Sequence, residues 1–213
     1  MQRRCYDAFH VKRPSQPSDV SRETLDALDR FSALLIRWNR TINLVSARDE
    51  PFLWERHIKD SLQLAPLLPP VAETAIDLGS GAGFPGLIVA LATGRPFDLI
   101  EADQRKAAFL FEAARVTGAR VRVHAVRIQD ATLPPAPVIT ARALAPLPKL
   151  LDLAAPLLAP GGQCLILAGS NVAGELTHAA AQWHMQVERI HSRTAPHACI
   201  LRIANLRRVI PAS

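Results

Sequence analysis

The chain has 213 residues and a formal net charge of +6, with 49% hydrophobic and 21% charged residues. This length suits one α/β domain plus an extension, and the composition is that of a globular protein that can bury a sizeable core. Its apolar runs are too short to span a bilayer, so no membrane partner is expected.

The three cysteines, Cys5, Cys164 and Cys199, lie far apart and form no CxxC motif. They imply neither a disulfide framework nor a zinc cluster, so we expect no metal site. Residues 1–12 include basic residues but no apolar stretch, which argues against a signal peptide. We therefore predict a cytoplasmic protein and expect a monomer.

The positive charge is concentrated in the second half of the chain. Residues 1–103 contain 12 Lys+Arg and 14 Asp+Glu, whereas residues 104–213 contain 13 Lys+Arg and 5 Asp+Glu. A basic half of this kind favours a polyanionic partner, with nucleic acid as the first candidate. A solvated basic surface without a partner is the alternative.

Residues 1–20 mix basic residues with prolines and predict a basic arm. A helix is expected from the N-cap Ser21 to about Asn39, and a second helical stretch at about 50–68. Prolines at the end of that stretch mark the expected boundary. The predicted division is an N-terminal arm and helical extension at 1–70 and an α/β body at 71–213.

His57 and Ser61 are four residues apart, so they would share one face of the second helix. A serine–histidine hydrolase would also need an oxyanion hole and a group that orients the base, and no GxSxG turn is present. The roles of His57, Asp60 and Ser61 stay open between bridging the extension to the body and reaching the substrate.

The most informative stretch is Asp77-Leu78-Gly79-Ser80-Gly81-Ala82-Gly83-Phe84-Pro85-Gly86. It follows a short apolar strand at 74–78 and precedes an apolar helix at 87–92. Spaced glycines allow the backbone to turn sharply and approach a ligand, and the N-terminus of the following helix favours polar or negative ligand groups.

Two ligand classes match this turn. Gly81-x-Gly83-x-x-Gly86 is typical of dinucleotide binding, and Asp77-x-Gly79-x-Gly81-x-Gly83 of S-adenosylmethionine methyltransferases. The apolar strand ends at Leu78, which favours the second pattern. It would place Asp77 where a carboxylate can meet the ammonium or sulfonium group of a ligand, and would repel a pyrophosphate.

Glu101 ends the next predicted strand, 97–101, and lies 20 residues after Gly81. At this spacing a nucleotide-binding α/β fold brings a carboxylate to the ribose hydroxyls, so Glu101 is a candidate cofactor ligand. A surface glutamate at a strand end is the alternative. A helix at 104–117 and an alternating strand at 120–126 are expected to follow.

Two further candidates follow later strands. The loop 127–130 occupies the position at which a doubly wound fold presents side chains to an adenine ring. Arg142 ends the predicted strand 138–141, so it should lie in the ligand crevice at the carboxyl edge of the sheet. An arginine that only ties down a loop is the alternative.

The remaining pattern completes an α/β sheet. We predict a helix at 147–158 that stops at Pro160-Gly161-Gly162, a strand at 163–168, and a helix at 172–183. Two closing strands follow at about 184–192 and 198–206, the second inserted antiparallel. The histidines of this region have no metal-ligand spacing and are expected to face solvent: His178, His184, His191 and His197.

From about Trp38 to Gly162 the chain resembles the bacterial small-subunit ribosomal RNA methyltransferase G family, also called glucose-inhibited division protein B. The likeness rests on Asn43-Leu44-Val45-Ser46, His57-Ile58-Lys59-Asp60-Ser61-Leu62, Asp77 through Gly86, Asp103 to Leu110, and Ala141-Arg142-Ala143. It implies a Rossmann-like class I methyltransferase with a mostly parallel seven-stranded sheet and an N-terminal helical extension.

The resemblance also implies methylation of N7 of a guanine in 16S RNA, with S-adenosylmethionine as the donor and small-subunit RNA or the 30S particle as the partner. Position by position, it implies cofactor contacts at Gly79, Phe84, Ile128, Gln129 and Arg142. The chain departs from the family at two places. Gln129 replaces a usual acid, and Ala168-Gly169 replaces a common Lys-Gly pair.

No catalytic residue is assigned, because guanine N7 attacks with a free lone pair and needs no general base; alignment supplies much of the acceleration. A nucleotide-dependent oxidoreductase and a non-enzymatic RNA-binding module are the competing hypotheses. Substituting Gly81 or Gly83 by Asp is expected to abolish cofactor binding, because either side chain would occupy the path of the ligand.

Overall fold

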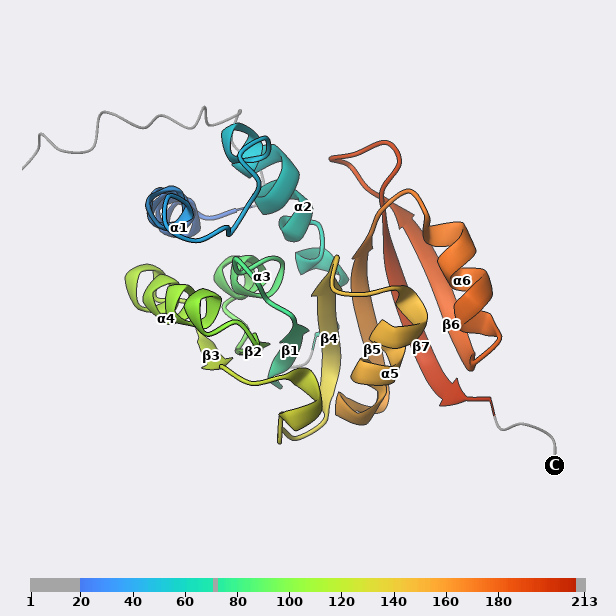
Figure 1. The fold of residues 1–213 in the computed structure, drawn as a ribbon. Coiled ribbons are helices and arrows are strands. Elements are labelled where there is room, and N and C mark those ends of the chain that lie inside the picture. The colour runs from blue at the N-terminus through green and yellow to red at the C-terminus, as the bar shows by residue number, and fades with distance from the viewer. Residues whose placement is uncertain (1–19, 71–72, 210–213) are drawn as a thin grey trace, which may run out of the picture.

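The computed structural model describes residues 20–70 and 73–209, which form a single seven-stranded sheet with helices on both faces (Figure 1). The strand order is β3-β2-β1-β4-β5-β7-β6, and every pair is parallel except those of β7 with β5 and β6. The strands are β1 Ala75–Leu78, β2 Phe97–Ile100, β3 Val121–His124, β4 Ala136–Arg142, β5 Leu158–Ala168, β6 Trp183–His191 and β7 Cys199–Arg208.

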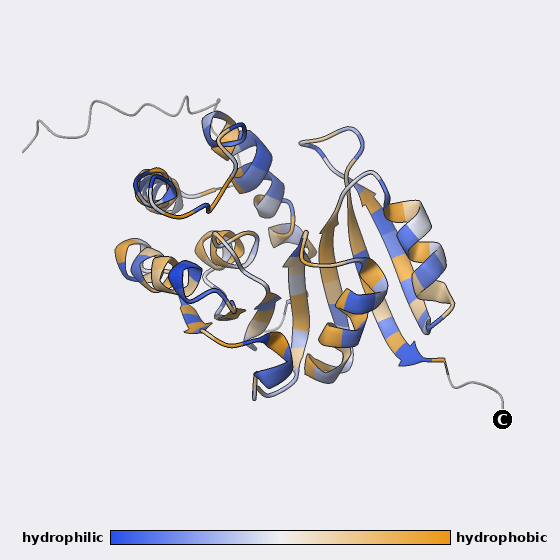
Figure 2. Cartoon of the chain, viewed as in Figure 1, coloured by the Kyte–Doolittle hydropathy of each residue, from blue (hydrophilic) through white to orange (hydrophobic). Residues whose placement is uncertain are grey.

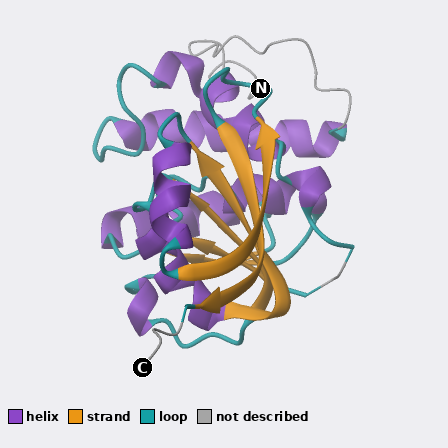
Figure 3. Cartoon of the chain, turned by 90° about the vertical axis from the view of Figure 1, so that its right-hand side faces the viewer, coloured by secondary structure: helices purple, strands orange, loops and turns teal. Residues whose placement is uncertain are grey.

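This topology confirms the predicted α/β class, the mostly parallel seven-stranded sheet and the antiparallel insertion of the final strand. The α-helices are α1 Arg22–Asn39, α2 Lys59–Leu62, α3 Gly86–Thr93, α4 Gln104–Thr117, α5 Leu147–Ala154 and α6 Val172–Ala180. Figure 3, turned by 90°, shows the twist of the strands and the helices on either side of them.

Two hydrophobic clusters form the core, one on each face of the sheet. The first contains the buried side chains of α1, α3 and α4, and the second those of α5 and α6. The central strands are largely apolar in Figure 2, as expected for strands covered on both faces. Because the first cluster extends from Leu25 in α1 to Ile200 in β7, the helical extension and the sheet share one core. The domain boundary at residue 70 stays a prediction.

Helix α1 begins where the sequence predicts. The Ser21 side chain accepts a hydrogen bond from the Thr24 N–H, which satisfies one of the free donors of the first turn. The apolar face of α1 lies against α4, where Phe31 and Phe109 have ring centroids 6.0 Å apart. Arg30 Nε donates to the carbonyl of Val116 at 3.2 Å, at the end of α4. These contacts fix the extension against the sheet-covering helices.

The second predicted helix, at 50–68, is wrong as a continuous element. The chain instead forms a 3₁₀ turn at Glu50–Phe52, a π-helical turn at Trp54–Ile58, the short helix α2, and a second 3₁₀ turn at Ala65–Leu67. The prolines Pro51 and Pro66 each lie in the first turn of a 3₁₀ segment, because proline lacks an N–H donor and cannot continue a helix from its interior. π-Helical turns occur frequently at functional sites.

The predicted helix stop at Pro160-Gly161-Gly162 is also wrong. Helix α5 ends at Ala154, one 3₁₀ turn follows at Ala155–Leu157, and β5 has already begun at Leu158. Gly161 has a φ of 74°, and the β4–β5 pairing shifts register between Ala136 and Val138. The glycines therefore allow an irregular backbone conformation inside β5, which residues with a side chain adopt less readily.

Candidate functional site

The glycine-rich turn lies at the carboxyl end of β1, and its three spaced glycines all have positive φ. The values are 64° at Gly79, 54° at Gly81 and 90° at Gly83. The turn is tied to the neighbouring strand, because the Ser80 N–H donates to the carbonyl of Ile100 at 3.0 Å. The predicted strand–turn–helix unit is therefore confirmed, with α3 beginning at Gly86.

The three glycines differ in what surrounds them. A Cβ on Gly79 would lie 2.4 Å from Leu144 Cδ1, and one on Gly83 would contact Leu87 and Phe31 in the core. A Cβ on Gly81 would meet only the carbonyl of Gly79, at 3.8 Å. Gly81 thus faces open space, where a ligand can approach the backbone. The expectation that Gly83→Asp would block the path of the cofactor is wrong, because the aspartate side chain would enter the core.

Glu101 follows β2 directly, and its carboxylate is hydrogen-bonded to the same turn. Its Oε2 accepts a hydrogen bond from the Gly81 N–H and its Oε1 one from the Asp103 N–H, each at 2.8 Å. The side chain is 9% exposed. Each oxygen retains a second lone pair, so the held carboxylate can still accept from ligand hydroxyls. The geometry therefore fits the predicted sugar ligand and disfavours the alternative of a free surface glutamate.

Asp77 does not face the crevice, and the expectation that its carboxylate meets a ligand cation is wrong. The residue is fully buried, and its Oδ1 accepts a hydrogen bond from Thr140 Oγ1, while Oδ2 has no hydrogen-bond partner within residues 20–70 and 73–209. Gly86 lies directly over it, since a Cβ there would be 2.5 Å from Asp77 Cβ. Burial raises the pKa of Asp77 to about 6, against the lowering effect of its hydrogen bonds. Asp77 fixes the first turn of α3.

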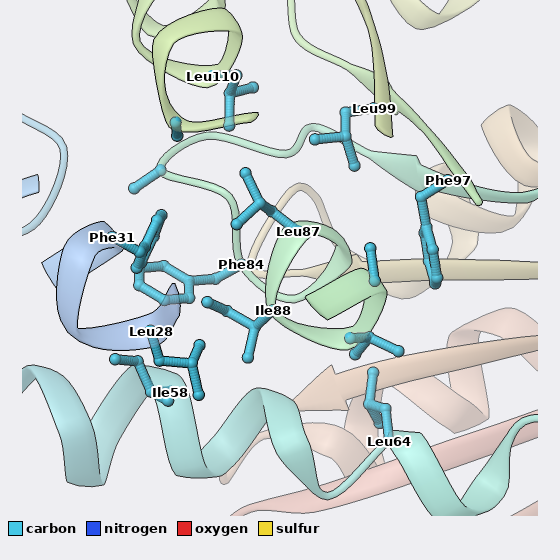
Figure 4. Packing of buried hydrophobic residues seen from close by; sticks show 14 of the residues in the cluster. Leu28, Phe31, Ile58, Leu64, Phe84, Leu87, Ile88, Phe97, Leu99 and Leu110 are labelled. Carbon is cyan, nitrogen blue, oxygen red and sulfur yellow. The ribbon is translucent and has the colours of Figure 1, made fainter. Parts of the chain in front are cut away.

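Phe84 is part of the core between the extension and the sheet. Figure 4 shows its side chain beside Phe31 in α1, and the two rings pack edge to face with centroids 5.6 Å apart. The imidazole of His57 stacks on Phe84 with centroids 5.1 Å apart and planes 24° apart. Since Phe84 is only 7% exposed, its backbone is the part available for the predicted cofactor contact.

Arg142 ends β4 on the other side of the turn, with its Cζ 5.9 Å from the centroid of the Phe84 ring. One guanidinium nitrogen, Nη1, is buried without a hydrogen-bond partner in the described residues. Burial lowers the pKa of Arg142, and the nearby Asp60 and Asp49 partly offset this effect. An unpaired buried donor is costly, so Nη1 is a candidate for a ligand acceptor.

His57 shares this environment. Both ring nitrogens are buried without a hydrogen-bond partner among the described residues. Burial and the positive charge of Arg142 lower the pKa of His57 to about 4, so the ring is neutral at neutral pH. The serine–histidine pair is absent, because Ser61 Oγ donates to the backbone carbonyl of His57 at 2.7 Å and is itself fully buried. Nothing here activates a serine nucleophile.

Ile128 and Gln129 lie in a 3₁₀ turn at Ile128–Asp130, beyond the carboxyl end of β3. Ile128 packs against the second hydrophobic cluster, whereas Gln129 is exposed. Because β3, β2, β1 and β4 are adjacent, the candidates at Ile128, Glu101, Gly81 and Arg142 follow one another along a single edge of the sheet. The sequence-predicted site residues are thus arranged in the order that an extended ligand would require.

A cavity of about 270 Å³ lies beyond Arg142 at the carboxyl ends of β4 and β5. Its walls combine apolar side chains with Glu175, whose Oε2 accepts from the Leu147 N–H at 2.9 Å. Ala168 and Gly169, where the chain departs from the family pattern, line the same cavity. No sequence pattern indicates this cavity, because its lining comes from separate strands and helices.

Metal and thiol chemistry find no support in the part of the chain that is described. No three His, Cys, Asp or Glu side chains there come together as a metal site, and the four histidines at 178, 184, 191 and 197 are exposed. Burial raises the pKa of the Cys164 thiol to about 12, which makes it a poor nucleophile. Within residues 20–70 and 73–209, no helix has the length and hydropathy needed to cross a membrane.

Comparison with known proteins gives one consistent result. A family model described as rRNA small subunit methyltransferase G (GidB) matches residues 24–199. The ribosomal RNA small subunit methyltransferase G of Gluconobacter oxydans is 56% identical over 191 residues, which cover 90% of this chain and 98% of that protein. Its counterpart from Granulibacter bethesdensis is 52% identical over 212 residues, covering 94% and 100%.

Solved structures show the same fold at much lower sequence identity. A TYW2 protein of M. jannaschii in complex with AdoMet has a TM-score of 0.56 at 16% identity, covering 72% of this chain and 76% of that chain. A ribosomal protein L11 methylase from Lactobacillus delbrueckii subsp. bulgaricus has a TM-score of 0.57 at 15% identity, covering 68% and 75%. The sheet and its flanking helices are therefore those of class I methyltransferases.

Proposed function

Because the chain belongs to the rRNA small subunit methyltransferase G family, we propose that it transfers the methyl group of S-adenosylmethionine to N7 of a guanine in 16S ribosomal RNA. The observation that supports this most strongly is the Gly81–Glu101 hydrogen bond of 2.8 Å beside a glycine that faces open space. A buried carboxylate held at a glycine turn is suited to the sugar of a nucleoside cofactor.

Six residues would bind the cofactor in this proposal. Glu101 would accept hydrogen bonds from the ribose, the backbone of Gly79 and Phe84 would line the turn, and Arg142 would donate from Nη1, which has no partner among the described residues. Ile128 and Gln129 flank the adenine ring from beyond β3. Gln129 presents an amide where the family pattern has an acid, so a side-chain contact at this position is a neutral hydrogen bond.

S-adenosylmethionine held by Glu101 and Arg142 would supply an electrophilic methyl group, which would pass from sulfur to the lone pair of guanine N7. The residues of this chain then have to align the two partners and exclude water, and no proton has to leave. The stacked rings of His57 and Phe84 hold the extension against the glycine turn. The low pKa of His57 keeps the imidazole neutral, so it adds no second positive charge beside Arg142.

The acceptor base would enter the cavity at the carboxyl ends of β4 and β5. Its volume of about 270 Å³ is near the lower end for small-molecule pockets, which start at about 300 Å³. Ala143, next to Arg142, lines it, so cofactor and acceptor would meet at this residue. The apolar walls would stack against the base, and Glu175, whose Oε2 accepts from the Leu147 N–H, would present its other carboxylate oxygen to the N–H groups of a guanine.

Small-subunit RNA, free or in the 30S particle, is the partner that fits the basic second half of the chain. The proposal includes action in the cytoplasm as a monomer, without a membrane partner.

The direct test is methyl transfer. Small-subunit particles from cells lacking this enzyme are incubated with the protein and S-adenosylmethionine labelled in the methyl group, and the labelled nucleotide is located by digestion and mass spectrometry. We expect one labelled nucleoside, 7-methylguanosine. A parallel calorimetric titration with NAD(P) should show no binding, and binding of NAD(P) without methyl incorporation would support the oxidoreductase hypothesis instead.

A further inference from the structure

Asp60 and Gln63 connect the helical extension to the loop between β6 and β7. Gln63 Nε2 lies 3.3 Å from Ser192 Oγ and 3.2 Å from Thr194 Oγ1, and Gln63 Oε1 accepts from the Arg193 N–H at 2.6 Å. Asp60 Oδ1 accepts from Thr194 Oγ1 at 2.7 Å. We call these five residues the clasp.

The clasp is a built arrangement and not a chance surface contact. Gln63 is 5% exposed, and its Nε2 also donates to Asp60 Oδ1 at 3.1 Å. Asp60 Oδ1 accepts in addition from Ser192 Oγ, at 3.4 Å, and Ser192 Oγ lies 2.9 Å from Thr194 Oγ1. None of these bonds involves the glycine turn, Glu101 or Arg142. The hydrogen bonds of the clasp therefore hold the β6–β7 loop and not the glycine turn, although the Asp60 carboxylate also acts on the nearby Arg142.

What the clasp positions is the loop 192–198. The loop is closed by the Ser192 N–H, which donates to the carbonyl of Ala198 at 3.1 Å. The clasp binds the backbone of Arg193 and leaves its side chain exposed, with no ion pair to any described residue. A loop whose backbone is fixed while its arginine points to solvent can bind an anion without losing much conformational entropy on binding.

Strand register places this loop at the edge of the sheet that holds the active site. Arg142 pairs with Leu167 in β5, Leu167 with Ile200 in β7, and Ile200 with Ile190 in β6. The loop begins two residues after Ile190. Three strand spacings separate β4 from β6, so the loop lies about 14 Å from Arg142 along the sheet. Figure 1 shows the β6–β7 loop beside α2 at this edge.

We propose that the loop 192–198, fixed by the clasp, binds the phosphodiester backbone of the RNA next to the target nucleotide, with Arg193 as the phosphate-binding cation. This inference rests on the proposed RNA substrate. Arginine side chains are among the usual partners of phosphate oxygens, and such contacts fix the register of the nucleic acid without reading its sequence. The hydroxyls of Ser192 and Thr194 and the Arg193 N–H already donate within the clasp, so the guanidinium of Arg193 supplies the contact.

Replacing Arg193 by Ala tests the cation. The matched control is Arg207→Ala, because Arg207 is also an exposed arginine of the same strand pair but lies toward the opposite end of β7. We expect Arg193→Ala to weaken binding to small-subunit RNA about fivefold at low salt. The slope of log affinity against log salt should become shallower by about 0.7 to 0.9. Arg207→Ala should change neither quantity.

The kinetics separate docking from chemistry. Arg193→Ala should raise the KM for RNA and leave kcat and S-adenosylmethionine affinity unchanged, and Arg193→Lys should restore most of the lost affinity. Gln63→Leu should reproduce the rise in KM, and adding it to Arg193→Ala should cause little further loss. Thermal unfolding of each variant identifies any effect that arises from misfolding.

Three outcomes of the binding and kinetic measurements would overturn the inference, and a fourth would come from the identity of the bound partner. These are unchanged RNA affinity in Arg193→Ala, equal losses in Arg193→Ala and Arg207→Ala, or a fall in kcat with unchanged KM. A ribosomal protein bound to the loop in place of RNA would also overturn it. In that case Arg193→Ala would raise the KM only when ribosomal proteins are present on the substrate. If the wild-type protein methylates no RNA at all, the proposed function fails. That result differs from the outcomes above, each of which requires an active wild-type protein or RNA binding by it.

Discussion

The imidazole of His57 lies stacked on the ring of Phe84, with centroids 5.1 Å apart, and neither of its nitrogens has a partner in the described residues. One residue comes from the π-helical turn of the extension and the other from the glycine turn after β1. The extension therefore packs directly on the glycine turn and is not an appended element.

This relationship predicts a pH-dependent stability. Burial, Arg142 and Arg56 lower the pKa of His57 to about 4, although Asp49 acts in the opposite direction. The unfolded chain binds the proton from about pH 6.5 downward, so the free energy of unfolding should fall as the pH drops from 6.5 to 4. Each unit of pKa difference corresponds to about 1.4 kcal/mol.

His57→Phe keeps an aromatic ring on Phe84 but removes the titrating group. Urea unfolding of both proteins at several pH values between 4 and 7.5 measures the effect. The stability of the variant relative to the wild type should increase steadily as the pH falls. Parallel curves for the two proteins would show that His57 does not titrate in this window.

Asp77 should behave in the opposite sense. Its pKa in the folded protein is raised to about 6 from 3.8, so the stability it contributes is present below pH 3.8 and is lost as the pH rises through 6. Asp77→Asn removes the buried charge and retains an oxygen for Thr140 Oγ1. Its stability relative to the wild type should rise by up to about 3 kcal/mol between pH 4 and pH 8. A pH-independent difference would contradict the assigned pKa.

The glycines of the turn should separate binding from folding. Gly81→Ala places a methyl group in open space at a φ of 54°, whereas Gly83→Ala places it 3.2 Å from Leu87 Cβ. Both cost about 1 to 2 kcal/mol in backbone strain. We expect Gly81→Ala to lower S-adenosylmethionine affinity more than its stability loss explains, and Gly83→Ala chiefly to lower the melting temperature. Calorimetry measures the affinity and thermal unfolding the stability. A larger loss of cofactor affinity in Gly83→Ala than in Gly81→Ala would contradict this assignment.

Glu101→Gln should weaken both the turn and the cofactor site. One oxygen becomes an NH₂ group, which would face the N–H of Gly81 or Asp103 in place of an acceptor. We expect at least a tenfold loss of S-adenosylmethionine affinity and a lower melting temperature. Glu112→Gln is the matched control, because Glu112 pairs with Arg115 on the surface of α4, away from the glycine turn. Equal behaviour of the two variants would exclude a role for Glu101 in the cofactor site.

The sequence predicted those features that depend on local pattern. The strand, the glycine turn and Glu101 were identified because apolar runs and glycine spacing are visible in a short window. Asp77 was misplaced because the pattern gives its position at the strand end but not the side from which Gly86 and Thr140 enclose it. The helix predicted at 50–68 is interrupted by a π-helical turn that packs against Phe84. Helical periodicity in the sequence carries no information about such a contact.

Contacts between segments far apart in the sequence could not be predicted either, because pattern rules act within a short window. Gln63 and Arg193 are 130 residues apart, and no spacing rule relates them. The cavity beside Arg142 is likewise assembled from the loop after β4 together with β5, α5, α6 and β7. Its residues acquire a common role only when the sheet order is known.

The central claim is that S-adenosylmethionine lies across the junction of β1 and α3, with its ribose at Glu101. A crystal structure of the protein with the bound cofactor tests this most directly. We expect the ribose hydroxyls within hydrogen-bond distance of the Glu101 carboxylate, the backbone of Gly81 against the cofactor, and the methyl group directed toward the cavity beside Arg142. A cofactor bound elsewhere, or one whose methyl group points away from that cavity, would contradict the account.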